Sequence, residues 1–328
     1  MRHERYRQLQ QLAGRVVLLS MARYAHLMPR RLVPFLGRLV GTMVMAISPR
    51  HRRIVMSNLR LAFGREKSET ALRVIARRFY HNFATGLLDF LRMPATSAEE
   101  IIATNRLEGE RYIDEALAQG NGVVLISAHY GNWETMGARL ALAGYKPLNV
   151  IARNQRDQEV TELLTGLRKH GGLRVIPRDG AIREATRRLQ NNEVLGMLID
   201  QNVAQRGVFV DFFGKLASTT AGAAVLAHRT RAVIVPVFCV RQPDGTQVGE
   251  IGPPIAVQRT DDAEADIIAN TAIFTKVIEQ AVRRHPDQWF WMHQRWKRRP
   301  EWELADAAPP AAEPAPAIGH GTLSHSDH

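Results

Sequence analysis

The sequence predicts an α/β protein, with a largely parallel central sheet covered by helices and a helical leader in front of it. Between residues 122 and 252, short apolar runs alternate with amphipathic stretches, which is the pattern of crossover units on a parallel sheet. From residue 5 to 92, apolar side chains recur at helical spacing instead. The 328 residues with 45% apolar content provide enough material for a full core.

The elements of the predicted sheet follow in order from the apolar runs and the amphipathic stretches between them. We expect strands at 122–127, 147–151, 173–176, 194–199, 232–240 and 247–252. We expect helices at 132–143, 157–169, 180–190, 219–229 and 263–284. In open sheets of this kind, ligands bind at the carboxyl ends of the strands. The polar residues just after each strand are therefore the first candidates for function.

Composition divides the chain into three parts. Residues 1–92 form the predicted helical leader, which is basic and apolar, and residues 93–303 form the predicted α/β domain. Residues 304–328 are rich in alanine and proline and then polar, so they cannot bury enough apolar surface to order. We expect this last part to be a disordered tail.

Positive charge is concentrated in the leader. Residues 1–60 carry twelve arginines and one acid, Glu4, within a formal net charge of +12. Such a basic end attracts nucleic acid, anionic lipid or an acidic carrier protein. No uncharged apolar window is long enough for a clean spanning helix, so we expect the segment to lie on a membrane surface. Two alternatives remain: arginine-rich helices packed on the protein's own core, and a shallow spanning anchor at 32–47.

Several kinds of chemistry have no signature here. The sequence has no glycine-rich nucleotide loop, no Gly-x-Ser-x-Gly elbow, no Cys-x-x-Cys pair and no His-Glu-x-x-His. We therefore expect neither a cofactor nor a metal. The one cysteine, Cys239, lies in an apolar run, which is typical of a buried residue in a reducing compartment. No secretory signal opens the chain, and nothing suggests export.

The run SAHYGNWE places His129 directly after the first predicted strand and Glu134 five residues later. This spacing lets a histidine on the strand-exit loop meet a carboxylate on the first turn of the next helix. A carboxylate in that position orients the imidazole and favours its protonated form. The pair is a candidate for activating a hydroxyl, although histidines and glutamates are also common near turns.

Further polar residues follow the neighbouring strands. Arg153 follows the strand at 147–151, and Arg168 closes the helix behind it; each is a candidate phosphate ligand or a solvated surface charge. Asp200 and Gln201 follow the strand at 194–199. They are candidates for orienting an arginine or accepting a substrate hydroxyl, or they cap a loop.

Two aromatic stretches have an open interpretation. Residues 207–214 (GVFVDFFG) are suited to an acyl-chain wall or to a core strand, and 218–224 (STTAGAA) to an anion-binding helix start or a plain cap. Residues 289–299 interleave three tryptophans with cations. That pattern fits single-stranded nucleic acid, a membrane interface or a packed terminal element.

Taken together, these residues resemble the bacterial lipid A late acyltransferases, lauroyl and myristoyl transferases that are similar to glycerolipid and lysophospholipid acyltransferases. The resemblance is carried by an ordered series of segments: 129–134 (HYGNWE), 151–153 (IAR), 166–168 (GLR), 200–201 (DQ), 207–214, 219–224 (TTAGAA) and 291–297 (WMHQRWK). Asp211 stands where a proline is usual, and Ala221-Gly222 replaces a frequent Thr-Gly. These departures affect the expected donor preference more than the reaction type.

The resemblance implies a glycerolipid acyltransferase-like fold and transfer of a fatty acyl group from acyl carrier protein to a hydroxyl of a lipid A precursor, at the cytoplasmic face of the inner membrane. His129 is then the expected base, and Glu134 steadies the imidazolium without a covalent intermediate. Arg153 and Arg168 are expected to bind phosphates of the acceptor or of the carrier's prosthetic arm. Asp200, beside Gln201, is expected to hold one of these arginines.

Three other functions compete with this one. The same chemistry is compatible with a lysophospholipid or another membrane lipid as acceptor. A non-enzymatic membrane-binding or nucleic-acid-binding protein would account for the leader but not for the polar strand ends, so nucleic acid is not an expected partner. Metal-dependent hydrolysis would need His129, Glu134 and Asp200 as ligands.

Overall fold

The computed structural model describes residues 2–205 and 207–300 of the chain. The tail expected at 304–328 lies outside the described residues.

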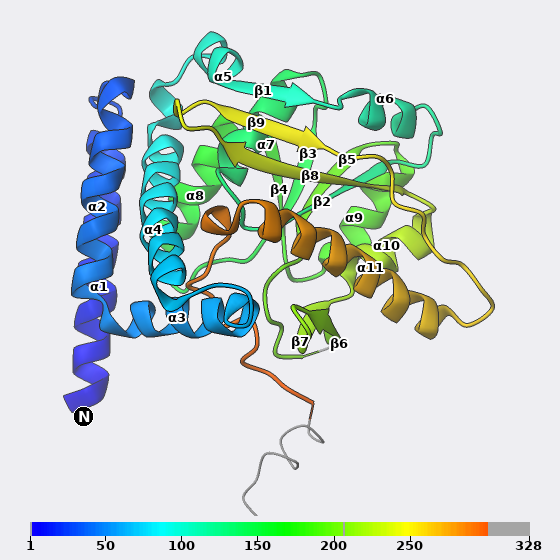
Figure 1. The fold of residues 1–328 in the computed structure, drawn as a ribbon. Helices are drawn as coiled ribbons and strands as arrows, with labels where there is room; N and C mark the ends of the chain where they lie inside the picture. Colours follow the sequence, from blue (N-terminus) through cyan, green and yellow to red (C-terminus); the bar gives the residue numbers. More distant parts are fainter. Residues whose placement is uncertain (1, 206, 301–328) are drawn as a thin grey trace, which may run out of the picture.

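A seven-stranded sheet forms the centre of the molecule, in the order β1-β9-β8-β2-β5-β3-β4 (Figure 1). Its strands are β1 (Asn105–Glu108), β2 (Val123–Ser127), β3 (Leu148–Ala152), β4 (Leu173–Pro177), β5 (Val194–Leu198), β8 (Val233–Arg241) and β9 (Gln247–Ile251). Neighbouring strands are parallel except β8 and β9, which form an antiparallel pair. The predicted α/β class and largely parallel sheet are confirmed.

Helices cover both faces of this sheet. Figure 1 shows α11 (Ala263–Arg284) in front of it, and α7 (Trp133–Leu142) and α8 (Gln158–His170) behind it. The remaining helices of this part are α5 (Ala98–Thr104), α6 (Arg111–Leu117), α9 (Ala181–Gln190) and α10 (Gly222–Thr230). Two short 3-10 helices, η2 (Met93–Ala95) and η3 (Pro286–Gln288), complete it.

The central strands β2 and β5 are apolar along most of their length because both faces of the sheet are covered there. Along β2, Val124 and Ile126 belong to the hydrophobic cluster on one face, and Val123 and Leu125 to the cluster on the other. This alternation is the pleat of a strand between two helical layers. Side chains at alternate positions of β2 thus reach different layers, which matters for the cavity described below.

The leader is helical, as expected, and consists of α1 (Arg2–Ala25), η1 (Arg30–Leu32), α2 (Val33–Ile47), α3 (Pro49–Phe63) and α4 (Glu69–Arg92). Helix α2 packs closely against α4. A Cβ atom added to Gly41 would lie 2.5 Å from the Tyr80 carbonyl oxygen, so only glycine permits this approach. Helix α4 joins the leader to the core through buried side chains such as Phe79 and Leu91.

The outer face of the leader carries an exposed apolar stripe. In α2 and η1 it is formed by Leu32, Phe35, Leu39, Met43 and Ile47, which are 44 to 75% exposed. Within the described residues, no single helix is long and apolar enough to cross a membrane. The bent pair Arg30–Ile47 and Pro49–Phe63, which meet at 97°, passes that test together by length and composition.

The structure also contains elements that the sequence did not predict. The short elements α5, β1 and α6 lie between the leader and β2. Strands β6 (Gly207–Phe212) and β7 (Lys215–Thr220) form an antiparallel hairpin outside the main sheet. The helix expected at 219–229 begins at Gly222, because residues 215–220 belong to this hairpin.

Candidate active site

His129 lies on the loop that joins β2 to α7. The loop must turn sharply, since Gly131 has a φ of +57° and a Cβ atom there would overlap the carbonyl of Cys239. Asn132 then caps α7 by accepting a hydrogen bond from the Thr135 amide at 3.3 Å. The His129 carbonyl accepts from the Phe290 amide at 2.9 Å. These contacts fix the backbone that carries the imidazole.

The carboxylate that contacts His129 is Asp200. Strands β2 and β5 are neighbours in the sheet and parallel, so the residues that follow them meet at one edge. Asp200 Oδ1 lies 2.8 Å from His129 Nδ1, and Oδ2 accepts from the His129 amide at 3.0 Å. Trp289 donates its indole N–H to the same Oδ2 at 2.8 Å. One buried carboxylate therefore accepts three hydrogen bonds.

Asp200 is ionised in this position. Burial acts to raise the pKa of its carboxyl group, but the attraction of His129 and the three hydrogen bonds outweigh burial and lower that pKa to about 2. An ionised carboxylate only accepts hydrogen bonds, so the hydrogen on the imidazole occupies Nδ1. The other nitrogen, Nε2, is then free to accept, and the Gln201 amide group lies 3.3 Å from it.

Glu134 does not contact the imidazole as the sequence led us to expect. Its two carboxylate oxygens accept from Arg168 Nη2 at 2.6 Å and Arg168 Nε at 3.0 Å. The first turn of α7 directs Glu134 toward α8, away from the imidazole's Nδ1 atom. Burial acts to lower the pKa of Arg168, but its bonds to Glu134 raise that pKa overall. The roles expected for the two acids are thus exchanged: Asp200 pairs with the histidine, and Glu134 with the arginine.

A cavity of about 920 Å³ lies beside these residues. His129, Trp133, Glu134, Arg168 and Gln201 line one part of it. A second part follows the sheet face beneath α7 and is apolar, with Leu125, Met136, Leu140, Leu148, Val150, Leu173, Val237 and Cys239 in its wall. Gly196 on β5 contributes no side chain to that wall, and this leaves room above the strand. The cavity is thus polar at the histidine and apolar along its length.

Loops that follow β3, β4 and β5 form the exposed part of the cavity lining. The loop after β3 contributes Arg153 and Gln155, the loop after β4 contributes Arg178, and the loop after β5 contributes Gln205. Arg153 is exposed and makes no ion pair within the described residues, unlike Arg168. Of the two arginines expected to bind phosphate, only Arg153 therefore has an unpaired guanidinium.

The stretch at 207–214 does not form the wall of this cavity. Phe212 and Phe213 are buried against Trp289 and Trp296, and from the whole region 207–224 only Thr220, Ala221 and Gly222 line the cavity. The expectation of an acyl-chain wall at 207–214 is therefore wrong. The start of α10, which follows the Ser-Thr-Thr run, does reach the cavity.

The tryptophan-rich segment at 289–299 is a packed structural element. Trp289, Trp291 and Trp296 are at most 8% exposed, so they present no surface on which nucleic-acid bases would stack. Asn58 of α3 donates to the carbonyls of Trp291 and His293 at 2.9 and 2.8 Å and so ties the segment to the leader. Sequence reasoning assigned no individual role to Trp289 or His293, although both lie in the stretch 289–299 that it singled out.

His293 is a second histidine near the site. Its Nε2 accepts from the Asn202 amide at 2.7 Å, two residues after Asp200. The pKa of His293 is lowered to about 4, mainly by burial. The charge of Asp200 acts to raise this pKa, whereas Arg295 and His129 lower it further. It is neutral at physiological pH and stabilises the loop after β5.

The residues weighed as a metal-ligand set are not gathered together. His129 and Asp200 are in contact, whereas both oxygens of Glu134 are bound to Arg168. Among the residues that the structure describes, no group of three or more His, Cys, Asp and Glu side chains is placed to hold a metal ion.

In this α/β protein, one nitrogen of His129 is fixed by a carboxylate and the imidazole lines a cavity. Such an arrangement is suited to activating a hydroxyl. Comparison with known proteins supplies the family. The family model of the bacterial lipid A biosynthesis acyltransferases matches residues 3–298, so the chain belongs to that family.

Individual relatives fall into two groups. The lipid A biosynthesis lauroyltransferase and palmitoleoyltransferase of Escherichia coli K12 are 28% and 26% identical, each over 84% of this chain and 88% of the relative. The phosphatidylinositol mannoside acyltransferase of Mycobacterium tuberculosis H37Rv is 28% identical over 57% of this chain. The chain spans 58% of the length of that mycobacterial relative.

Proposed function

We propose that this protein transfers a fatty acyl group from acyl carrier protein to a hydroxyl of a lipid A precursor glycolipid. The observation that carries the proposal is His129, whose Nδ1 is held by Asp200 and whose Nε2, 3.3 Å from the Gln201 amide, is on the side of a cavity with a long apolar wall. The two Escherichia coli relatives, which match over most of the chain, are named for lipid A biosynthesis. Their names support the choice of acceptor.

The proposed reaction is a direct transfer. The acceptor hydroxyl takes the place of the Gln201 amide at His129 Nε2 and gives up its proton to this nitrogen as its oxygen attacks the thioester carbonyl. The carbon–sulfur bond breaks, and the imidazolium returns the proton to the departing thiolate. Asp200 stabilises the imidazolium through Nδ1, which is the role first expected of Glu134. The Gln201 amide, displaced by the hydroxyl, is proposed to donate to the carbonyl oxygen as it becomes negative.

The acyl chain is proposed to lie under α7. The apolar wall begins beside His129 and runs over β2, β3 and β5 to Leu140, Leu148 and Leu173. Burying methylene groups against such a wall gains about 0.8 kcal/mol for each CH₂. The depth of this wall, rather than residues 207–214, is then what sets the preferred chain length.

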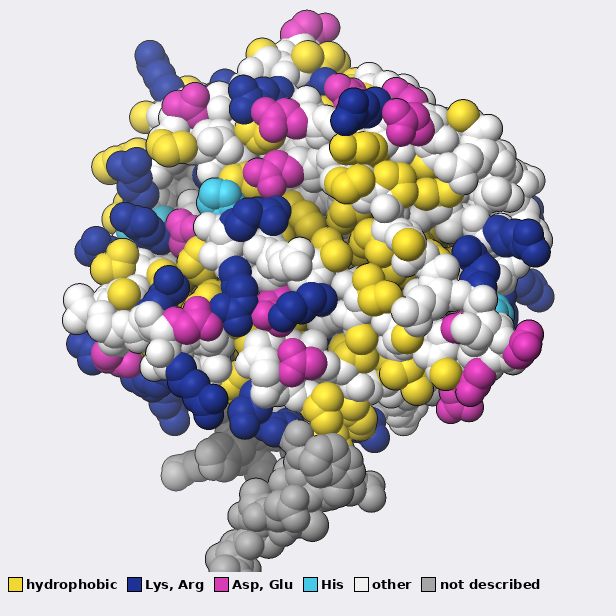
Figure 2. Space-filling view, turned by 45° about the vertical axis from the view of Figure 1, so that its right-hand side comes forward, with side chains coloured by type: hydrophobic (Ala, Val, Ile, Leu, Met, Phe, Trp, Pro, Cys, Tyr) yellow, Lys and Arg dark blue, Asp and Glu magenta, His cyan; other side chains and the backbone are white. Residues whose placement is uncertain are grey.

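Acyl carrier protein and the acceptor's phosphate are proposed to bind at the exposed loops of the cavity. Figure 2 shows Lys and Arg side chains mixed with Asp and Glu over much of the face that it draws. Arg153, Arg156 and Arg178 are exposed at or next to the lining loops and are cations to which an acidic carrier would bind. Arg168 is proposed to contact the acceptor while remaining paired with Glu134.

The leader is proposed to rest on the cytoplasmic face of the inner membrane. The exposed stripe of α2 supplies the apolar face, and exposed arginines such as Arg31 and Arg38 flank it. Arg15 of α1 lies 3.2 Å from Asp157, beside the loop that carries Arg153. A membrane-bound leader would therefore bring the exposed loops of the cavity close to the lipid surface.

The decisive experiment replaces His129 by alanine. Purified enzyme is supplied with labelled acyl carrier protein and a lipid A precursor, and the product is identified by mass spectrometry. We expect H129A to lose at least about a thousandfold in kcat with an unchanged circular dichroism spectrum. His170→Ala, at the exposed end of α8, is the matched control and should keep full activity. Full activity in H129A would refute the base assignment.

A second acceptor has specific support from the mycobacterial relative, which is named for phosphatidylinositol mannoside. Offering the enzyme a lipid A precursor, a phosphatidylinositol mannoside and a lysophospholipid in parallel separates the possibilities. Preferential acylation of the lipid A precursor is expected. Preference for another acceptor would keep the mechanism and overturn the proposed substrate.

A further inference from the structure

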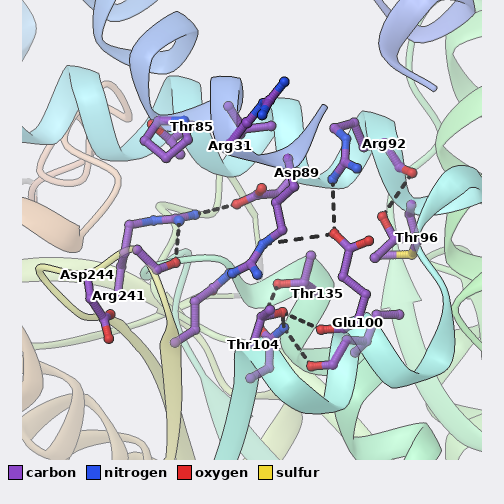
Figure 3. Close-up of a pocket in the computed structure, with 18 residues that line it drawn as sticks. Arg31, Thr85, Asp89, Arg92, Thr96, Glu100, Thr104, Thr135, Arg241 and Asp244 are labelled. Carbon is purple, nitrogen blue, oxygen red and sulfur yellow. Dashed lines mark hydrogen bonds and ion pairs between the residues drawn. The ribbon is translucent and has the colours of Figure 1, made fainter. Parts of the chain in front are cut away.

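A second cavity, of about 440 Å³, lies where η1 and the start of α2 meet α4, α5 and the turn between β8 and β9 (Figure 3). None of its lining residues belongs to the catalytic cavity. Its volume falls within the range of ligand pockets in proteins. Acyl transfer at His129 does not explain why a polar cavity of this size exists here.

The inner part of this cavity contains two arginines whose positions are fixed by carboxylates. Arg241 Nη2 lies 2.7 Å from Asp89, and Arg92 Nη1 lies 3.4 Å from Glu100 while Arg92 Nε donates to the Met28 carbonyl at 2.8 Å. Figure 3 shows both pairs facing the cavity. Because each inner carboxylate already has a cationic partner, these acids do not exclude an anion.

The rim of the cavity is more positive than its interior. Arg31 is exposed and makes no ion pair within the described residues, and Arg30 lies only within 3.9 Å of Glu100. The four lining arginines exceed the three lining carboxylates by one, and the third carboxylate, Asp244, is exposed on the β8–β9 turn. An arginine with free donors beside two pre-oriented arginines is a typical arrangement for binding phosphate.

The surroundings of the rim indicate where the phosphate comes from. Val33 and Pro34 line the cavity, and the exposed apolar stripe of α2 begins at the adjacent residues Leu32 and Phe35. A ligand that places a phosphate in the cavity would therefore lay any attached hydrocarbon along this stripe. A lipid has both parts, whereas a soluble phosphate compound has only the first.

We propose that this cavity binds the phosphate head group of an anionic lipid, with Arg31 and Arg30 at the phosphate. The site lies outside the catalytic cavity and needs no acyl transfer. It would fix the leader on the membrane at one defined point, in addition to the general attraction between its arginines and an anionic surface.

The test measures binding of the full-length protein to vesicles of phosphatidylcholine with and without phosphatidylglycerol. Arg31→Ala removes a cation from the cavity rim, and Arg38→Ala removes an equal charge from the adjoining helix α2, at an exposed position that does not line the cavity. We expect R31A to weaken binding to the anionic vesicles about tenfold or more, and R38A about fivefold or less. Equal losses in the two variants would overturn the site in favour of general electrostatic attraction.

Two further measurements sharpen this result. Asp244→Asn removes the exposed acid from the cavity and should tighten binding to anionic vesicles severalfold; no change or a weakening would count against the site. Soluble glycerol phosphate should neither bind nor compete, and competition that R31A abolishes would overturn the lipid assignment. H129A should bind vesicles as the unaltered protein does, so failure of the proposed catalytic function and failure of this site are distinguishable.

Discussion

Two carboxylates beside the catalytic cavity lie in different surroundings. Asp200 is 3% exposed and accepts hydrogen bonds from His129, on a neighbouring strand-end loop, and from Trp289, directly after η3. Glu134 has a side chain that is 12% exposed and forms a two-point ion pair with Arg168, between α7 and α8. The first acid is therefore tied to His129, the proposed base, and the second to an arginine in the wall of the cavity.

This difference shows that spatial pairing follows sheet order rather than distance in the sequence. Asp200 is seventy-one residues from His129, yet their strands are neighbours and end at the same edge. Glu134 is five residues from His129, but the direction of α7 determines its partner. A carboxylate close in sequence is thus a poor guide to which acid orients a histidine, unless the order of the strands is known.

The largest expected effect is that of Asp200→Asn. An asparagine presents an amide group that donates, which disfavours a hydrogen on Nδ1 and places it on Nε2, where the base must be free. We expect kcat to fall about a thousandfold or more, with little change in KM, measured with the labelled acyl carrier protein assay. The same change at Asp211, exposed on the β6–β7 hairpin, should leave kcat unaltered.

D200N also tests whether the two acids differ in what they do for His129. If it keeps more than about a tenth of the kcat, Asp200 does not set the hydrogen position of His129, and the contrast with Glu134 disappears.

A smaller loss is expected from Glu134→Gln, because its effect passes through Arg168. Glutamine cannot accept both arginine donors, so the guanidinium group shifts in the cavity wall. We expect kcat/KM to fall about a hundredfold in E134Q and in Arg168→Met, and the double variant to lose no more than the worse single variant. Glu162→Gln, exposed on α8, is the control.

Additive losses in that cycle would show that Glu134 acts on the reaction separately from Arg168. The direct contact with the imidazole that the sequence suggested would then have to form in the substrate complex.

The sequence was sufficient for six of the seven strands of the main sheet and for helices α7 to α11, since burial on both faces leaves apolar runs such as Val123–Ser127 that are easily recognised. It was not sufficient for the β6–β7 hairpin. The turn of that hairpin uses Phe213 and Gly214 at φ values of +58° and +71°. Hairpin turns are usually recognised in a sequence by Asn-Gly or Asp-Gly, and neither is present here. Phe213 is held there by tertiary contacts, including its amide donating to buried Glu279 at 2.9 Å.

The candidate site also has one part that the sequence could predict and another that it could not. His129 was recognisable because a histidine directly after an apolar run is a local signal. The pairing of His129 with Asp200, and the contribution of Trp289, depend on three segments that meet only in the folded chain. The second cavity had no local signal, since its four arginines come from η1, α4 and β8.

The smallest effect expected is on the stability of the fold. It comes from His293, which holds the loop that carries Asp200. Its pKa of about 4 in the folded protein is below the ordinary value of about 6.5, so between these pH values the unfolded chain binds more protons. Stability should therefore fall as the pH falls through this window, by on the order of 2 kcal/mol. Protonation of Nε2 would also break its bond from the Asn202 amide.

His293→Gln keeps an acceptor for the Asn202 amide but does not titrate. Urea unfolding at pH 7 and at pH 5 should show a smaller loss of stability in H293Q than in the unaltered protein. The same substitution at His51, which is exposed at the start of α3, should leave the pH dependence unchanged. An identical decline in H293Q and the unaltered protein would mean that other groups carry the acid sensitivity, and that the loop after β5 does not depend on a neutral histidine.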